Sequence, residues 1–375
     1  MRNIVLIVMK NIVLLIALSI SLAAHAQVKT PRGSKMAGVS EQIGITDITI
    51  TYSRPAVNGR EGKIWGDLVP YGFVDYHYGT SKAAPWRAGA NENTTIEFST
   101  AVTIEGKPLP AGKYGFFIAM GPEKATLVFS KDNNAWGSFY YNAASDALRV
   151  EVPVKKTTES IEWLKYEFAA ETDSSAVAVI EWEKLKVPFT IAVDLKKTQV
   201  EAYRYAFNSG TFYEYWQNMQ QAADFCLIND VNLEEGLSWA DRSINTYFGE
   251  ANFRTLSTYA GLLEKAGRKH EADSVMKTAW PKGNTQEIYY YGYKLLRMKK
   301  NQQALETFKI NYEKAPKDWV TSFGLAKGYA VVGDKSTAIK YADISLQLAP
   351  NPGTKAYIER LKQDITNGKD VSGYY

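Results

Sequence analysis

Apolar and polar residues alternate through much of the first half of the chain, which is the pattern of half-buried β-strands. In the segment DITITY, for example, Ile48, Ile50 and Tyr52 would lie on one face of a strand. Similar short segments follow, separated by turn sequences such as EGKP and DNN and not by helical patterns. This spacing indicates a sandwich or a barrel, and the many aromatic residues favour two packed sheets. We therefore predict an all-β antiparallel sandwich over residues 42–196.

A helical periodicity replaces the alternation after Leu195, and its later part repeats with an offset of 34 residues. The pairs at this offset are Pro316 and Pro350, Ala304 and Ala338, Phe308 and Ala342, Gly292 and Ala326, Tyr291 and Leu325, and Leu295 and Tyr329. This is the length of a tetratricopeptide repeat, in which small residues let two helices approach and a proline ends the second helix. Two less regular copies precede these. We predict an all-α array of three to four tetratricopeptide-like hairpins over residues 197–365, then a flexible tail over residues 366–375.

The first 26 residues have the features of a signal peptide. Arg2 and Lys10 are basic, an apolar run extends to Leu22, and Ala24-His25-Ala26 fits the small-x-small pattern of signal peptidase sites. A retained membrane anchor is the alternative, although the apolar run is short for a membrane span. We expect cleavage after Ala26, and we interpret residues 27–41 as a linker to the sandwich.

The stretch PWRAGANENTT, at the start of a predicted strand, places Trp86, Arg87, Asn91, Glu92 and Asn93 within eight residues. As a recognition surface, Trp86 would offer a flat face to a sugar or peptide and Arg87 would bind a carboxylate. As a structural turn, the asparagines would bond to the backbone, and Arg87 would pair with Glu92 or Asp67. Both interpretations stay open. The candidate ligand-binding residues are Arg54, Arg60, Trp86, Arg87, Asn91, Glu92, Asn93 and Trp136.

Three segments of the β region resemble a secreted bacterial family known as domain of unknown function 2911. They are YSRPAVNGREGKIWGDLVPYG, WRAGANENTTIEFSTAVTIEGKPLPAGKYGFFIAM and VFSKDNNAWGSFYYNAASDALRVEV. The resemblance implies export, a β-sandwich and no established activity. Together with the signal peptide, it predicts a protein of the periplasm, the cell surface or the extracellular medium of a Gram-negative bacterium.

Composition and motifs argue against most cofactor chemistry. The histidines that would remain after cleavage, His77 and His270, fall in different predicted domains, and the sequence has no HExxH, paired cysteines or P-loop. Cys226 is the single cysteine and lies in an apolar helical context, which favours a buried thiol. The formal net charge of +4 gives no field suited to nucleic acid. We expect no metal, no cofactor and no nucleic-acid partner, and we favour a non-enzymatic protein.

Stacked helical hairpins create a concave groove that suits an extended peptide or a partner domain. The sequence therefore predicts binding or scaffolding through this groove, with Tyr289, Tyr293 and Trp319 among its lining residues. The alternative function is binding or hydrolysis of a small polar ligand, such as a carbohydrate, peptide or organic anion, at residues 86–95. In a third possibility the sandwich itself fills the groove.

Overall fold

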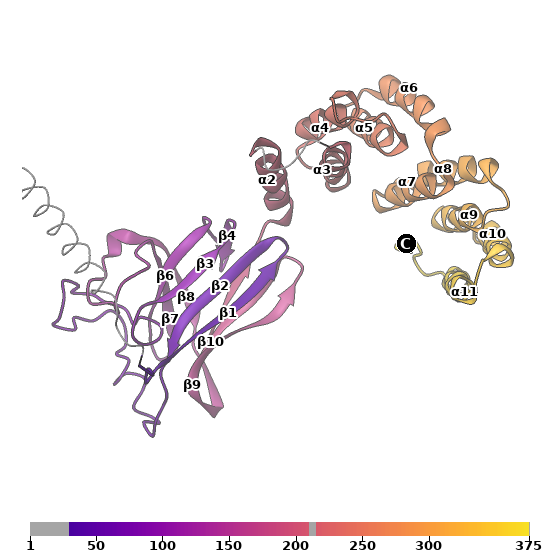
Figure 1. Ribbon diagram of the computed structural model, residues 1–375. Coiled ribbons are helices and arrows are strands. Elements are labelled where there is room, and N and C mark those ends of the chain that lie inside the picture. Colours follow the sequence, from indigo (N-terminus) through magenta and orange to yellow (C-terminus); the bar gives the residue numbers. More distant parts are fainter. Residues whose placement is uncertain (1–29, 210–214, 375) are drawn as a thin grey trace, which may run out of the picture. The chain divides into compact units, whose positions relative to one another are not determined.

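The computed structural model describes residues 30–209 and 215–374, which divide into two compact units after Leu195 (Figure 1). The first unit is built from β-strands and the second from α-helices, as the periodicity predicts. The predicted signal peptide, residues 1–26, lies outside the described residues, as does Tyr375. Within the described ranges, no helix is long and apolar enough to cross a membrane.

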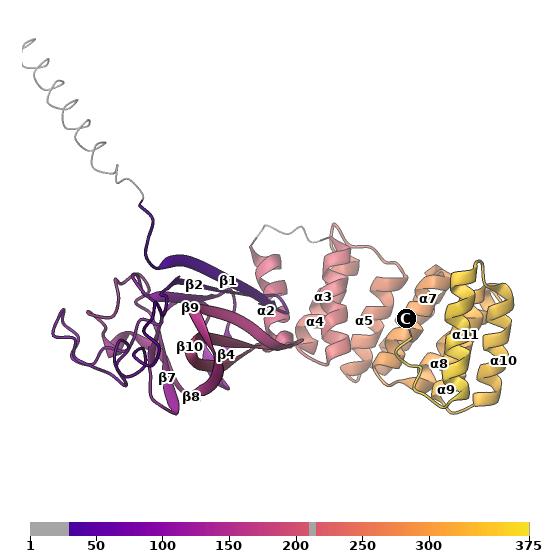
Figure 2. The same ribbon diagram turned by 90° about the horizontal axis from the view of Figure 1, so that it is seen from below.

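Two antiparallel sheets form the β unit (Figure 2). The larger has six strands in the order β1-β2-β3-β6-β7-β8, and the smaller has four in the order β5-β4-β10-β9. Their bounds are β1 (Lys35–Ile43), β2 (Thr46–Arg54), β3 (Thr94–Phe98), β4 (Val102–Ile104), β5 (Lys107–Leu109), β6 (Gly112–Ala119), β7 (Lys124–Ser130), β8 (Asp146–Pro153), β9 (Lys155–Thr172) and β10 (Ser175–Ala192). The buried rings of Phe116 on β6 and Phe189 on β10 lie 5.5 Å apart between centroids, so the core fills the space between the sheets. The predicted sandwich is confirmed.

Strand β1 begins at Lys35, within residues 27–41, which the sequence analysis interprets as a linker. The sheet therefore begins earlier in the chain than the sequence predicts. The partner strand β2 alternates as expected, with Ile48 and Ile50 fully buried. Among the described strands, β1 lies at an edge and pairs only with β2, and its side chains, such as Met36 at 58% exposure, are mostly exposed or half-buried. An edge strand of this kind has little apolar alternation to reveal it.

The helical unit contains ten α-helices in its described residues. They are α2 (Leu195–Asn208), α3 (Trp216–Asn229), α4 (Leu233–Asn245), α5 (Phe253–Lys265), α6 (Lys269–Ala279), α7 (Thr285–Arg297), α8 (Asn301–Lys314), α9 (Trp319–Val331), α10 (Lys335–Leu348) and α11 (Pro352–Thr366). Three-residue loops join α3 to α4, α5 to α6, α7 to α8 and α9 to α10, which gives four hairpins. Figure 1 shows α3, α5, α7 and α9 along the inner side of this curved array. The tetratricopeptide-like repeats are confirmed.

Small residues let the hairpins pack closely, as the repeat pattern predicts. Phe308 on α8 is fully buried against Gly292 on α7 and Gly324 and Gly328 on α9. A Cβ atom added to Gly292 would lie 2.3 Å from the Phe308 ring, which is closer than nonbonded atoms can approach. The glycines therefore make the space that this ring fills.

The segment after α11 differs from the flexible tail that the sequence predicts. Val371 is only 2% exposed, and Tyr374 packs against Tyr357 of α11 with ring centroids 5.5 Å apart. The polar sequence NGKDVSG hides this arrangement, because only one apolar side chain anchors it before the tyrosine.

Candidate binding groove

The stretch that begins at Trp86 is bonded mainly to itself. The Trp86 side chain is 8% exposed, stacks on Trp182 and donates from Nε1 to the Gly89 carbonyl over 3.1 Å. It therefore offers no flat face to a ligand, because both the ring and its N–H are used inside the unit. The Thr94 hydroxyl and the Tyr166 hydroxyl both donate to the carbonyl of Ala88, whose φ of +54° is a left-handed conformation. These bonds stabilise a strained turn.

Arg87 also stabilises the turn. Its guanidinium donates to the Asn91 carbonyl over 2.8 Å and lies 5.1 Å from the centroid of the Phe139 ring. Burial lowers the pKa of Arg87. The predicted pairing of Arg87 with Glu92 or Asp67 is not found, because Glu92 instead pairs with Arg32 at the surface over 2.8 Å. The guanidinium bonds the backbone of its own turn.

The two asparagines and two further arginines bond to nearby backbone. Asn91 donates to the Ser34 carbonyl, and the buried Asn93 donates to the Thr94 carbonyl. Arg54 donates to the Leu164 carbonyl, and Arg60 donates to the carbonyls of Ala56 and Val57. Each arginine thus has its own backbone partner, and these contacts give no sign of a shared anion pocket.

Trp136 differs from these residues because 61% of its surface is exposed. It precedes Gly137, where an added Cβ would lie 2.6 Å from the Arg87 guanidinium carbon. Its ring is available at the surface beside the turn.

Replacing Arg87 by alanine should lower the free energy of unfolding of the β unit by about 1–2 kcal/mol, because a charged hydrogen bond and a cation–π contact are lost. Chemical denaturation would measure this. The matched control is Arg32→Ala, which removes an exposed ion pair and should cost about 0.5 kcal/mol or less. An Arg87→Ala protein as stable as its parent would contradict a structural role for this residue.

The helical unit holds a groove of about 490 Å³ along the first helices of three successive hairpins, α3, α5 and α7. Its lining residues are Gln220, Asp224, Ile228, Phe253, Arg254, Ser257, Asn284, Gln286, Glu287, Tyr290, Tyr291, Tyr293, Lys294 and Arg297. On each helix the lining includes residues three or four positions apart, such as Gln220 and Asp224 on α3 or Tyr290 and Lys294 on α7, which share one helix face. The groove is therefore built from the inner face of the array.

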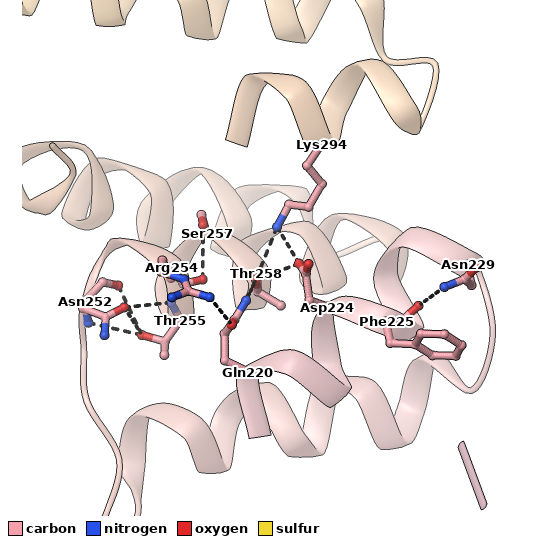
Figure 3. Close-up of polar contacts among 10 residues, drawn as sticks. All are labelled: Gln220, Asp224, Phe225, Asn229, Asn252, Arg254, Thr255, Ser257, Thr258 and Lys294. Carbon is pink, nitrogen blue, oxygen red and sulfur yellow. Dashed lines mark hydrogen bonds and ion pairs between the residues drawn. The ribbon is translucent and has the colours of Figure 1, made fainter. Parts of the chain in front are cut away.

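A hydrogen-bonded network ties the three helices together on this face (Figure 3). Lys294 Nζ lies 2.6 Å from Asp224 Oδ1 and 3.3 Å from Thr258 Oγ1. Thr258 in turn donates to Asp224 over 3.1 Å and accepts from Gln220 Nε2 over 3.1 Å. Because the Lys294 and Asp224 side chains are only 13% and 24% exposed, this pair fixes helix spacing and neutralises both charges.

Two further cations, Arg254 and Arg297, lie at the same groove. Arg254 lies 5.8 Å from the centroid of the Trp216 ring and makes a long 3.5 Å bond to Gln220 Oε1. Arg297 is exposed, and neither arginine forms an ion pair with a described residue. The nearby acid Glu287 accepts from the Asn284 backbone as part of the cap of α7. The lining thus carries three cations against the carboxylates of Asp224 and Glu287, so the groove has a small excess of positive charge.

The predicted groove residues are distributed unevenly. Tyr293 lines the groove, and Trp319 lines a smaller cavity of about 180 Å³ between α7, α9 and α11. Tyr289 lines that cavity too but is 4% exposed, because its ring packs against Phe308 and Phe323.

Gln220, Asp224, Arg254 and Lys294 are absent from the sequence prediction. Polar side chains on a helix resemble a solvated face, and the sequence signal that could identify them is their spacing of three or four on the first helix of each hairpin.

The part of the chain that the structure describes contains neither a group of metal ligands nor a reactive thiol. No group of three or more His, Cys, Asp or Glu side chains is placed there to hold a metal ion. Cys226 is buried between helices, and burial raises the pKa of its thiol to about 11, which keeps it protonated. His77 is 87% exposed at its side chain and lies 3.7 Å from Asp75.

Comparison with known proteins identifies one family. The model of a protein family of unknown function, DUF2911, matches residues 34–191. No curated protein matches the chain. Among solved structures, YrrB, described as a TPR protein with an unusual peptide-binding site, is 14% identical, covers 44% of this chain and 84% of its own, and has a TM-score of 0.25. MamA from Desulfovibrio magneticus RS-1 is 18% identical, covers 41% of this chain and 86% of its own, and also has a TM-score of 0.25. The β-sandwich thus matches the DUF2911 family model over most of its length, and tetratricopeptide-like repeats follow it in the chain.

Proposed function

We propose that this protein is a non-enzymatic binding protein that holds an extended segment of a partner protein in the groove along α3, α5 and α7. The observation that carries the proposal is the groove itself, which crosses three hairpins and has a fixed polar floor. A floor already cross-linked by Lys294 and Asp224 loses little conformational entropy when a ligand binds. We also propose that it acts after export, in the periplasm or at the cell surface.

The charges of the groove favour an acidic partner segment. Lys294 is neutralised by Asp224, whereas Arg254 and Arg297 keep their charges available. A guanidinium binds a carboxylate through two parallel hydrogen bonds, which gives direction as well as attraction. Tyr290, which is 41% exposed, adds a ring surface for an apolar side chain of the same segment.

The test uses pools of fluorescent synthetic peptides in which Asp and Glu are spaced among apolar residues, with matched pools that carry Asn and Gln instead. Fluorescence polarisation should show binding of acidic pools to the purified protein and weaker binding at high salt. In the double variant Arg254→Gln/Arg297→Gln, affinity should fall about tenfold or more, because charge-assisted hydrogen bonds are lost.

Lys277→Gln is the matched control, because Lys277 is an exposed cation on α6 and does not line the groove. It should leave peptide affinity unchanged. Equal binding of the acidic and amide pools, or no binding by either, would argue against an acidic segment in this groove.

A further inference from the structure

Lys327 on α9 is a buried amine in an aromatic surrounding. The residue is 0% exposed, and its Nζ lies 4.5 Å from the ring centroid of Tyr293 and 5.4 Å from that of Tyr289. It forms no ion pair with any described residue. Instead it donates to the Tyr374 carbonyl and, over 3.4 Å, to the Tyr289 hydroxyl. A buried ammonium without a carboxylate is costly, so the backbone carbonyl is the partner that satisfies it.

The segment that supplies this carbonyl is anchored at two further points. The Val371 side chain is buried in the apolar core formed mainly by α7 to α11. The Tyr374 hydroxyl donates to Asp364 on α11, and the Tyr374 ring lies 5.5 Å from that of Tyr357. Residues 370–374 are thus held as a ligand would be, by an apolar anchor, a hydroxyl and a carbonyl.

These anchors adjoin the inner face of the array. Tyr289, Phe323 and Tyr357 line the cavity of about 180 Å³, and the Phe323 and Tyr357 rings lie 5.6 Å apart. That cavity shares Gln286 and Tyr290 with the groove along α3, α5 and α7. In Figure 1 the segment that follows α11 runs on the inner side of the helices. Residues 370–374 therefore cover the inner face at α9 and α11, whereas the groove lies along α3, α5 and α7.

We propose that Lys327, Asp364 and Tyr357 form a second peptide site, specific for a short turn that carries an apolar residue and a tyrosine, and that residues 370–374 of this chain occupy it. Lys327 recognises a backbone carbonyl, Asp364 recognises the tyrosine hydroxyl, and Tyr357 packs on the tyrosine ring. The site stands on its own contacts and does not depend on what the neighbouring groove binds.

The probe is the fluorescent peptide NGKDVSGYY, which has the sequence of residues 367–375. The full-length variant Val371→Gly/Tyr374→Ala should release its own tail and bind the peptide. The parent should bind at least about tenfold more weakly, because its tethered tail competes at an effective concentration on the order of millimolar. Replacing the first tyrosine of the peptide by alanine should lower its affinity for the released variant about tenfold, since a hydroxyl bond and a ring contact are lost.

A released variant that is folded by circular dichroism but binds the peptide no better than the parent would overturn the proposal. Hydrogen exchange on the parent keeps the test decisive if the variant does not fold. Amides of residues 371–374 should exchange at least about tenfold more slowly in the protein than in the free peptide, as expected for a docked segment. Equal exchange rates would show an unbound tail and would also overturn the proposal.

Discussion

Replacing Phe308 by alanine should lower the free energy of unfolding of the helical unit by about 3–5 kcal/mol. The ring is fully buried, and three glycines on α7 and α9 surround it. It also touches Tyr289, with centroids 5.9 Å apart. Because backbone atoms form much of the enclosure, the surroundings cannot close over the cavity that the substitution leaves. Denaturation followed by far-ultraviolet circular dichroism, which reports mainly on helices, would measure the loss.

Two further variants test whether stability depends on the volume of the Phe308 side chain and on the space that the glycines leave for it. Phe308→Leu keeps most of the volume and should recover much of the lost stability. Gly292→Ala should destabilise the unit although alanine is the better helix former, because its Cβ would lie 2.3 Å from the Phe308 ring. If Phe308→Ala cost less than about 1 kcal/mol, the glycine-lined enclosure would not be what holds these hairpins together.

Much of this fold follows from local sequence. The alternation at Ile48 and Ile50 requires a strand with one buried face, and the offset between Ala304 and Ala338 requires repeated hairpins. Strand β1 was beyond such reasoning, because an edge strand pairs through its backbone and needs few apolar side chains. The docking of the tail could not be predicted from local sequence either, since it depends on contacts with Lys327 and Asp364, which are distant in sequence from one another.

The candidate sites show a different limit. The composition around Arg87 fits a ligand site and a polar turn equally well, and only the acceptor of its N–H, the Asn91 carbonyl, distinguishes them. Periodicity can place Asp224 and Lys294 on inner helix faces, but it cannot show that they neutralise each other. The charge of the groove therefore depends on a contact between helices α3 and α7, 70 residues apart in sequence.

The environment of Lys327 makes stability depend on pH. Burial lowers the pKa of its amine from 10.5 to about 7. The groups that face it are the Tyr289 hydroxyl and the Tyr293 ring on α7 and the carbonyl of the tail residue Tyr374, whose own hydroxyl donates to Asp364 on α11. The pKa of Asp364 is lowered, chiefly by Lys369, and that of Tyr374 is raised by burial. These two groups therefore affect stability mainly in acid and above about pH 10, outside the range in which Lys327 titrates.

Stability of the helical unit should therefore rise by about 2–3 kcal/mol between about pH 7 and about pH 9. In this range the unfolded chain keeps the Lys327 proton while the folded chain releases it, so raising the pH favours the folded state; below about pH 7 both states are protonated and the dependence ends. Denaturation curves of the parent and of Lys327→Met across this range would measure the effect. Methionine keeps most of the length without the charge, so the variant should lose the rise, and any contribution from Cys226 cancels in the difference. Parallel curves for the two proteins would mean that Lys327 stays protonated in the folded state, held by the Tyr374 carbonyl and the tyrosine rings.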